Sequence, residues 1–121
     1  MMLRRVPGCF EGETAERAAV LMQEHGVDVV PVMNDNDSVT GLVVGHELLQ
    51  VLKRPGPSSV RLRDVMRRLN FVVLSLTDGL DAITAQLLQM PVRYAVVVDG
   101  AGQCVGVLDS VALIERPLAR S

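Results

Sequence analysis

The sequence predicts an α+β fold in which two β-α-β-β-α repeats pack against each other with pseudo-twofold symmetry. The first observation is an internal repeat, because an offset of 65 positions superposes Gly41 on Gly106 and Val32 on Val97 without a gap. The second is that both copies show helix, strand and turn signals in the same order. The third is the length of 121 residues, which is about one domain, so the two copies must share a core.

The first copy contains the signals of a helix, a hairpin and a second helix. The capping residue Thr14 precedes apolar residues at helical spacing, and Gly26 ends that helix. Two β-branched runs follow, joined by a turn of Asn, Asp and Ser residues. The expected elements are a helix from Thr14 to His25, strands over 27–32 and 39–44, and a helix over 45–52.

The second copy shows the same order after a first strand. Its expected elements are a strand over 71–74, a helix capped by Thr77 or Asp78, strands over 94–98 and 104–108, and a last helix with Val111, Leu113 and Ile114. The first repeat is assigned to residues 1–54, the linker to 55–60 and the second repeat to 61–121, together one domain. Because the first repeat has no counterpart of the segment Asp64-Val65-Met66, we expect its N-terminal lead-in to be truncated.

Composition and charge exclude several classes of protein. The net charge of −2 argues against a surface built for nucleic acid or for an anionic membrane. Six basic residues between Lys53 and Arg68 form a basic belt, for which we favour a solvated face over attraction of phosphates. Two cysteines, no export signal and no apolar run long enough to cross a bilayer indicate a cytoplasmic protein with reduced thiols.

Catalytic equipment is not evident in the sequence. The segment His46-Glu47-Leu48-Leu49-Gln50 is similar to a zinc-protease helix, but Gln50 replaces the second histidine of that motif. Cys9 and Cys104 lie in apolar segments, and neither has a histidine near it in the sequence. We therefore expect no enzymatic activity, no metal site and no obligatory cofactor.

Five motifs in a fixed order carry a family resemblance that covers nearly the whole chain. They are Thr14-Ala15-Glu16-Arg17-Ala18-Ala19, Val30-Pro31-Val32, Gly41-Leu42-Val43, Arg63-Asp64-Val65-Met66, and Ala95-Val96-Val97-Val98-Asp99 leading to Gly106-Val107. In this order the chain resembles a tandem pair of cystathionine β-synthase (CBS) domains, the Bateman module. Members of that family are usually not enzymes. Their paired repeats form a disc and often bind adenosine-containing ligands in clefts between the repeats.

The resemblance implies a ribose site with the pattern Gly, two aliphatic residues, Thr or Ser, two variable residues and Asp. In the first repeat Val44 stands at the hydroxyl position and Glu47 at the carboxylate position, with His46 just before Glu47. A carboxylate there accepts hydrogen bonds from both ribose hydroxyls. A glutamate in the first turn of a helix also stabilises that helix through its dipole, and both interpretations of Glu47 stay open.

The second repeat departs further from the family pattern. Asp109 stands at the hydroxyl position and Ala112 at the carboxylate position. Asp109 and Ser110 offer a rearranged ribose contact, although we favour capping of the last helix for Asp109. Arg93 matches a position where family members often carry a basic residue, whereas its counterpart Asp28 would repel a phosphate. We therefore expect one occupied cleft rather than two.

The resemblance also implies that strand residues beside the clefts contact the ligand. The candidate binding residues are Val29, Val30, Val44, His46, Glu47, Arg93, Tyr94, Ala95, Asp109 and Ser110. The leading hypothesis is a non-catalytic, homodimeric regulatory module that senses AMP, ADP, ATP or S-adenosylmethionine and relays occupancy to a regulated protein partner. The alternative, which Val44 and Ala112 favour, is a ligand-free scaffold for dimerisation or protein interaction with degenerate nucleotide sites.

Overall fold

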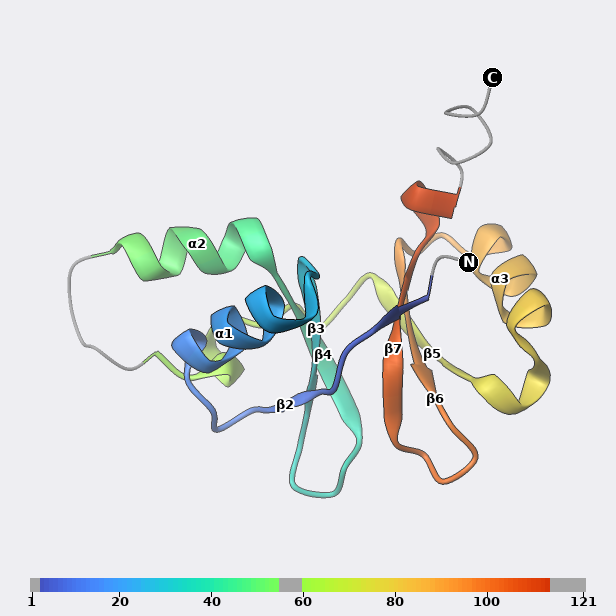
Figure 1. The fold of residues 1–121 in the computed structure, drawn as a ribbon, viewed down its shortest axis with the longest axis horizontal. Coiled ribbons are helices and arrows are strands. Elements are labelled where there is room, and N and C mark those ends of the chain that lie inside the picture. Colours follow the sequence, from blue (N-terminus) through green and yellow to red (C-terminus); the bar gives the residue numbers. More distant parts are fainter. Residues whose placement is uncertain (1–2, 55–59, 114–121) are drawn as a thin grey trace.

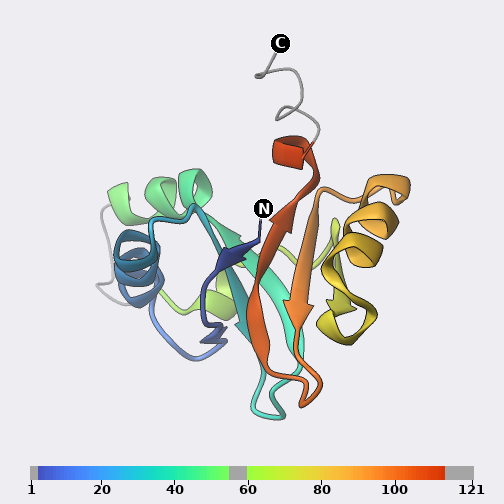
Figure 2. The same ribbon diagram turned by 45° about the vertical axis from the view of Figure 1, so that its right-hand side comes forward.

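The computed structural model describes residues 3–54 and 60–113, and the predicted α+β fold is confirmed. The first repeat contains β2 (Cys9–Phe10), α1 (Ala15–His25), β3 (Val29–Met33), β4 (Val39–Val44) and α2 (Gly45–Lys53). The second contains β5 (Phe71–Ser75), α3 (Leu80–Gln89), β6 (Tyr94–Val98), β7 (Cys104–Asp109) and a helix that begins at Ser110 and is described through Leu113. The strands of both repeats meet in the middle of the molecule, with α1 and α2 on one side and α3 on the other (Figures 1 and 2).

The strand pairing repeats with the offset of 65 positions that the sequence shows. Strand β2 runs parallel to β3 with Phe10 opposite Met33, and β5 runs parallel to β6 with Ser75 opposite Val98. The antiparallel pairs β3–β4 and β6–β7 share their register in the same way, including an irregularity at Val32/Met33 and at Val97/Val98. The two copies therefore have the same backbone plan.

The turns between the antiparallel strands are also equivalent. The Asn34 side-chain oxygen accepts hydrogen bonds from the backbone amides of Asn36 and Ser38, at 2.9 and 3.1 Å. One carboxylate oxygen of Asp99 accepts from the amides of Ala101 and Gln103, both at 2.9 Å. Side chains of this type mimic a backbone turn, so the predicted hairpins are confirmed.

Several helix and strand ends differ from the prediction by a single residue, and two starts differ more. The helix of the second repeat is not capped by Thr77 or Asp78, because residues 76–78 form a 3₁₀ turn and α3 begins after Gly79, whose φ of 86° favours glycine. Strand β3 begins two residues later than expected, because the Val27 amide still donates to the Met22 carbonyl at the end of α1. Thr14 and Gly26 cap α1 as predicted. Residue Ile114, expected in the last helix, and residues 55–59 of the expected linker lie outside the described residues.

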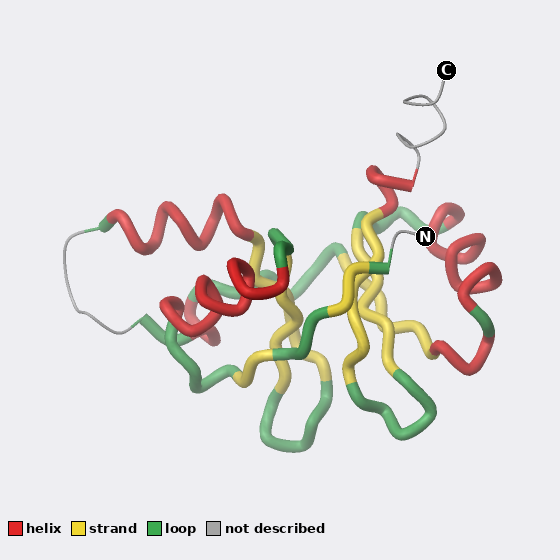
Figure 3. The backbone as a smooth tube through the Cα atoms, viewed as in Figure 1, coloured by secondary structure: helices red, strands yellow, loops and turns green. Residues whose placement is uncertain are grey.

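Each repeat is completed by a segment of chain from the other. Strand β1 (Arg4–Arg5) belongs to the first repeat in sequence but pairs antiparallel with β7 of the second, as the crossing N-terminal strand shows in Figure 3. Residues 61–67, which we call the connecting segment, precede β5 but pack on the first repeat. There the Arg67 amide donates to the Leu42 carbonyl at 2.7 Å, and the Leu42 amide donates to the Arg67 carbonyl at 2.9 Å. The sheets are therefore β2-β3-β4 and β1-β7-β6-β5.

The hydrophobic core joins the two repeats. The larger group of buried residues takes most of its members from the first repeat, yet it includes Tyr94, Val96 and Val107 from the second and Leu62 from the connecting segment. A smaller group around Ile83 and Leu87 lies under α3. The predicted packing of the copies against each other is confirmed. No helix in residues 3–54 and 60–113 is both long and apolar enough to span a membrane.

Candidate functional site

Half of the candidate binding residues belong to the protein interior. Their side chains are at most 5% exposed, and they are Val29, Val30, Val44, Tyr94 and Ala95. Val29 lies opposite Val44 in the first sheet, and Tyr94 lies opposite Asp109 at the equivalent place of the second. These five residues belong to the hydrophobic core.

Glu47 and His46 line a pocket in the first repeat, which we call the α2 pocket. It has a volume of about 400 Å³ and lies between α2 and the connecting segment. The residues that line it are His46, Glu47, Gln50, Val51, Arg54, Asp64, Val65 and Arg67. Its size falls in the range of small-molecule sites, and its walls carry charges of both signs.

Glu47 and Arg67 form a two-pronged ion pair in the α2 pocket. The Arg67 Nε donates to Glu47 Oε1 at 2.8 Å and the Arg67 Nη2 donates to Oε2 at 2.9 Å. The hydrogen bonds from Arg67 hold the pKa of the Glu47 carboxyl below its ordinary value, although desolvation acts the other way. The same bonds raise the pKa of the Arg67 guanidinium. Glu47 is therefore a carboxylate at neutral pH with both oxygens engaged.

The charged candidates of the second repeat form a second ion pair, which lies near enough for the Arg93 charge to act on Arg67. The Arg93 Nε and Nη2 donate to the two carboxylate oxygens of Asp109 at 3.1 Å, and the Arg93 guanidinium carbon lies 5.1 Å from the centre of the Tyr94 ring. Asp109 Oδ1 also accepts from the Val111 amide at 3.0 Å, so the expected capping role of Asp109 is confirmed. The Ser110 amide donates to the Arg93 carbonyl at 2.8 Å. Asp109 thus fixes the start of the last helix.

The repeated fold agrees with the comparison against known families. The family model described as the CBS domain matches residues 1–54 and again residues 62–118. The chain belongs to the CBS domain family. A tandem CBS pair is a module of the regulatory and signal-transducing type, and the resemblance noted in the sequence is confirmed.

Solved structures with the same fold cover almost all of this CBS pair. Staphylococcus aureus OpuCA is 19% identical, with a TM-score of 0.64 over 99% of this chain and 98% of that one. The CBS domains of a Streptococcus pneumoniae transcriptional regulator are 19% identical, with a TM-score of 0.62 over 93% of each chain. A Burkholderia ambifaria protein with CBS domains is 22% identical, with a TM-score of 0.63 over 96% of this chain and 85% of that one.

A curated relative of the CBS pair is an uncharacterized protein of Methanopyrus kandleri. It is 27% identical over an alignment of 100 residues that covers 79% of this chain. The chain spans about half the length of that relative.

The sequence did not single out the basic side chains of the α2 pocket. Arg54 and Arg67 belong to the basic belt, for which a solvated face was expected. That expectation is wrong for Arg67, because its side chain is only 33% exposed and binds Glu47. Arg61 also donates to a backbone carbonyl, that of Gly12 at 2.8 Å. The only sequence signal for this ion pair was the excess of arginine next to the linker. The acidic partner of Arg67, Glu47, lies 20 residues earlier in the chain.

The cysteines of the CBS pair are poor nucleophiles. Burial raises the pKa of Cys9 to about 12 and the pKa of Cys104 to about 11. A thiol with so high a pKa holds almost no reactive thiolate near neutral pH. In the part of the chain that the structure describes, no three His, Cys, Asp or Glu side chains are grouped so that they could hold a metal ion.

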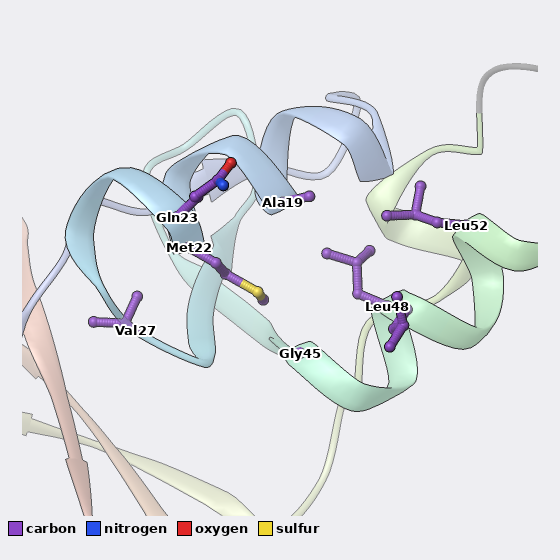
Figure 4. A pocket seen from close by; sticks show the side chains of 8 residues that line it. Ala19, Met22, Gln23, Val27, Gly45, Leu48 and Leu52 are labelled. Carbon is purple, nitrogen blue, oxygen red and sulfur yellow. The ribbon is translucent and has the colours of Figure 1, made fainter.

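An apolar groove runs between the two helices of the first repeat. It has a volume of about 320 Å³ and is lined by Ala19, Met22, Gln23, Val27, Gly45, Leu48, Leu49 and Leu52. Figure 4 shows Met22 on α1 and Leu48 on α2 pointing toward the space between the helices. At its rim Leu49 is 49% exposed and Leu52 is 40% exposed, so two large aliphatic side chains meet solvent together.

Proposed function

We propose that this CBS pair senses an adenosine-containing small molecule, which binds in the α2 pocket. The observation that carries the proposal is the position of Glu47. It stands where the family has its ribose-binding carboxylate, and it lines a pocket of about 400 Å³ with two arginines. Such a volume suits a ligand of nucleotide size. The second repeat has no equivalent carboxylate, because Ala112 takes that position, which supports a single occupied cleft.

The chemistry of the α2 pocket matches the parts of such a ligand. The Glu47 carboxylate accepts hydrogen bonds from the two ribose hydroxyls, and these charge-assisted bonds are stronger than neutral ones. The aliphatic Val51 and Val65 side chains in the same pocket offer apolar surface to the adenine ring. The ligand binds without covalent change, so the function is regulatory rather than catalytic.

The connecting segment supports a relay from the α2 pocket to the second repeat. Its residues Asp64, Val65 and Arg67 line the pocket, and a few residues later the chain enters β5. A ligand in the pocket therefore touches the first repeat through α2 and the chain that leads into the second. In this proposal occupancy shifts the packing of the two repeats, and a regulated protein partner in the cytoplasm responds to that shift.

The first experiment is thermal unfolding of the purified chain with AMP, ADP, ATP, S-adenosylmethionine and NAD. A ligand that binds only the folded state at a hundred times its dissociation constant adds about 2.7 kcal/mol to the free energy of unfolding. We expect a rise of the midpoint with at least one adenosine compound. An unchanged midpoint with every compound at millimolar concentration contradicts the proposal.

A substitution then locates the ligand. Glu47→Ala is expected to weaken binding by about 1.5–3 kcal/mol, the usual loss for a hydrogen bond to a charged group. Asp81→Ala is the matched control, because Asp81 is also an acidic residue in the first turn of a helix but lies on α3, outside the α2 pocket. Equal effects of the two substitutions on affinity would remove Glu47 from the site.

The apolar groove between α1 and α2 supports a second candidate function, a scaffold that dimerises. The occupant we propose is the same groove of a second copy, because the exposed Leu49 and Leu52 side chains at its rim are self-complementary in a twofold contact. Leu49→Glu is expected to convert a dimer into a monomer in sedimentation velocity. Leu88→Glu on α3 is the control, since Leu88 has nearly the same exposed fraction, 48% against 49%. A wild-type monomer at high concentration contradicts this proposal.

A further inference from the structure

The ion pair of the α2 pocket already occupies the group that a ribose needs. The Arg67 guanidinium donates to both oxygens of Glu47, at 2.8 and 2.9 Å. A ribose diol that donates one hydroxyl to each oxygen of Glu47 requires the same acceptor positions in the plane of the carboxylate. A ligand that binds Glu47 through its diol must therefore displace Arg67.

The displaced arginine cannot move far from the pocket. The backbone of Arg67 is held by two hydrogen bonds to Leu42, at 2.7 and 2.9 Å, so only its side chain can swing. That side chain is 33% exposed, so water solvates only part of the displaced guanidinium, and a ligand group that accepts its hydrogen bonds replaces the pair that it loses. A ligand that brings such an acceptor for Arg67 therefore binds more tightly than one that does not.

The other charged groups of the pocket define what that acceptor is. Arg54 lines the same pocket, and in residues 3–54 and 60–113 it forms no ion pair. Asp64 is the second acidic group on the pocket wall, and His46 adds a titratable ring. Once a diol takes Glu47, two guanidinium groups face one remaining carboxylate. A phosphate, which accepts two parallel hydrogen bonds from an arginine, restores the balance.

We propose that Arg67 makes the α2 pocket selective for adenosine ligands that carry a phosphate, by exchanging Glu47 for that phosphate when the ligand binds. This inference rests on the proposed function. A neutral nucleoside leaves the displaced Arg67 without a partner. S-adenosylmethionine offers a single carboxylate that is accompanied by a sulfonium and an ammonium group, so it is a weaker partner for Arg67 than a phosphate.

The test is isothermal titration of the full chain with AMP and with adenosine, which share the diol and the base. We expect the wild-type chain to bind AMP at least about tenfold more tightly than adenosine, and S-adenosylmethionine more weakly than AMP. Adenosine that binds as tightly as AMP overturns the selectivity while it leaves the proposed function in place. Failure of AMP, adenosine and S-adenosylmethionine alike overturns the proposed function itself.

Arg67→Gln separates the role in selectivity from a structural one. We expect this variant to lose AMP affinity by about tenfold and to keep or gain affinity for adenosine, because Glu47 is then free. A loss of equal size for both ligands shows a structural role and overturns the proposal. Arg68→Gln is the control, since Arg68 is the neighbouring arginine and its side chain donates to the Arg63 carbonyl at 3.2 Å. If Arg67→Gln does not fold, the wild-type affinity ratio of AMP to adenosine decides the matter alone.

Discussion

The two repeats share a backbone plan but use their charged residues differently at the same end of the sheet. In the first repeat Val44 ends the strand, and the carboxylate of Glu47 comes one turn later, where it faces a pocket. In the second repeat the carboxylate has moved to the strand end as Asp109, where it holds Arg93 and caps the last helix. A shift of three positions thus turns a group that can meet a ligand into one that serves the fold.

This difference shows that pseudo-symmetry of the backbone does not imply two equivalent sites. The hydrogen bond from the amide of Gly45 to the Asp28 carbonyl has its counterpart between Ser110 and Arg93, at 2.7 and 2.8 Å. The backbones therefore match even where the side chains do not. Function follows the side chains, and only the first repeat keeps a carboxylate at the family position.

Among the substitutions that test the exchange of segments between the repeats, one at Leu62 is expected to lower the free energy of unfolding most. This side chain is fully buried among residues of the first repeat, although the sequence assigns it to the second. Leu62→Ala is expected to lower the free energy of unfolding by about 3 kcal/mol in urea denaturation, because it leaves a cavity. Leu69→Ala, at a side chain that is 81% exposed, is expected to change it by less than about 0.5 kcal/mol. Similar effects of both would contradict the exchange of segments between the repeats.

A second test of the exchange of segments adds a methyl group at Gly41, where the connecting segment packs on the first repeat. An ideal Cβ at this position would clash with the Arg67 carbonyl oxygen, so the connecting segment must move. We expect Gly41→Ala to cost about 2 kcal/mol of unfolding free energy through this overpacking. Gly100→Ala is the control, because its Cβ would meet Thr77 at an ordinary 3.4 Å. Gly41→Ala with wild-type stability would show that the close approach is absent in solution.

The comparison between the two ion pairs becomes sharper when each carboxylate is removed. Asp109→Ala deletes a helix cap and is expected to cost about 1–2 kcal/mol. Glu47→Ala deletes an ion pair whose side chains are 33% and 38% exposed, for which about 0.5 kcal/mol is expected. Thermal unfolding of both variants without ligand measures the difference. A larger loss for Glu47→Ala would contradict the assignment of Asp109 to the fold and Glu47 to a ligand.

The sequence predicted the repeats and their elements because these depend on local patterns and on an offset that can be counted. Thr14, Gly26 and the turns at Asn34 and Asp99 act through neighbours a few residues away. The pairing of Arg67 with Glu47 was not predicted, because it depends on how the connecting segment packs back onto the first repeat. The start of α3 was not predicted correctly either. Thr77 and Asp78 are residue types that often cap helices, but here they lie in a 3₁₀ turn that precedes α3.

The smallest expected effect is the dependence of stability on acid pH through Glu47. Its pKa is lowered in the folded chain by the hydrogen bonds from Arg67, from an ordinary value of 4.5. The folded state therefore binds fewer protons than the unfolded state, so the stabilisation is present above pH 4.5 and is lost as the pH falls through the lower folded value. Because both side chains are partly exposed, we expect a loss of only a few tenths of a kcal/mol.

Urea denaturation of wild type and Glu47→Gln across this acid range measures that loss. The glutamine variant cannot titrate at this position, so its stability is expected to fall less steeply than that of wild type. Parallel curves for wild type and Glu47→Gln would show that Arg67 does not bind the carboxylate in solution. In that case Glu47 is free to accept a ribose without an exchange, and the difference between the two repeats would rest on the Asp109 cap alone.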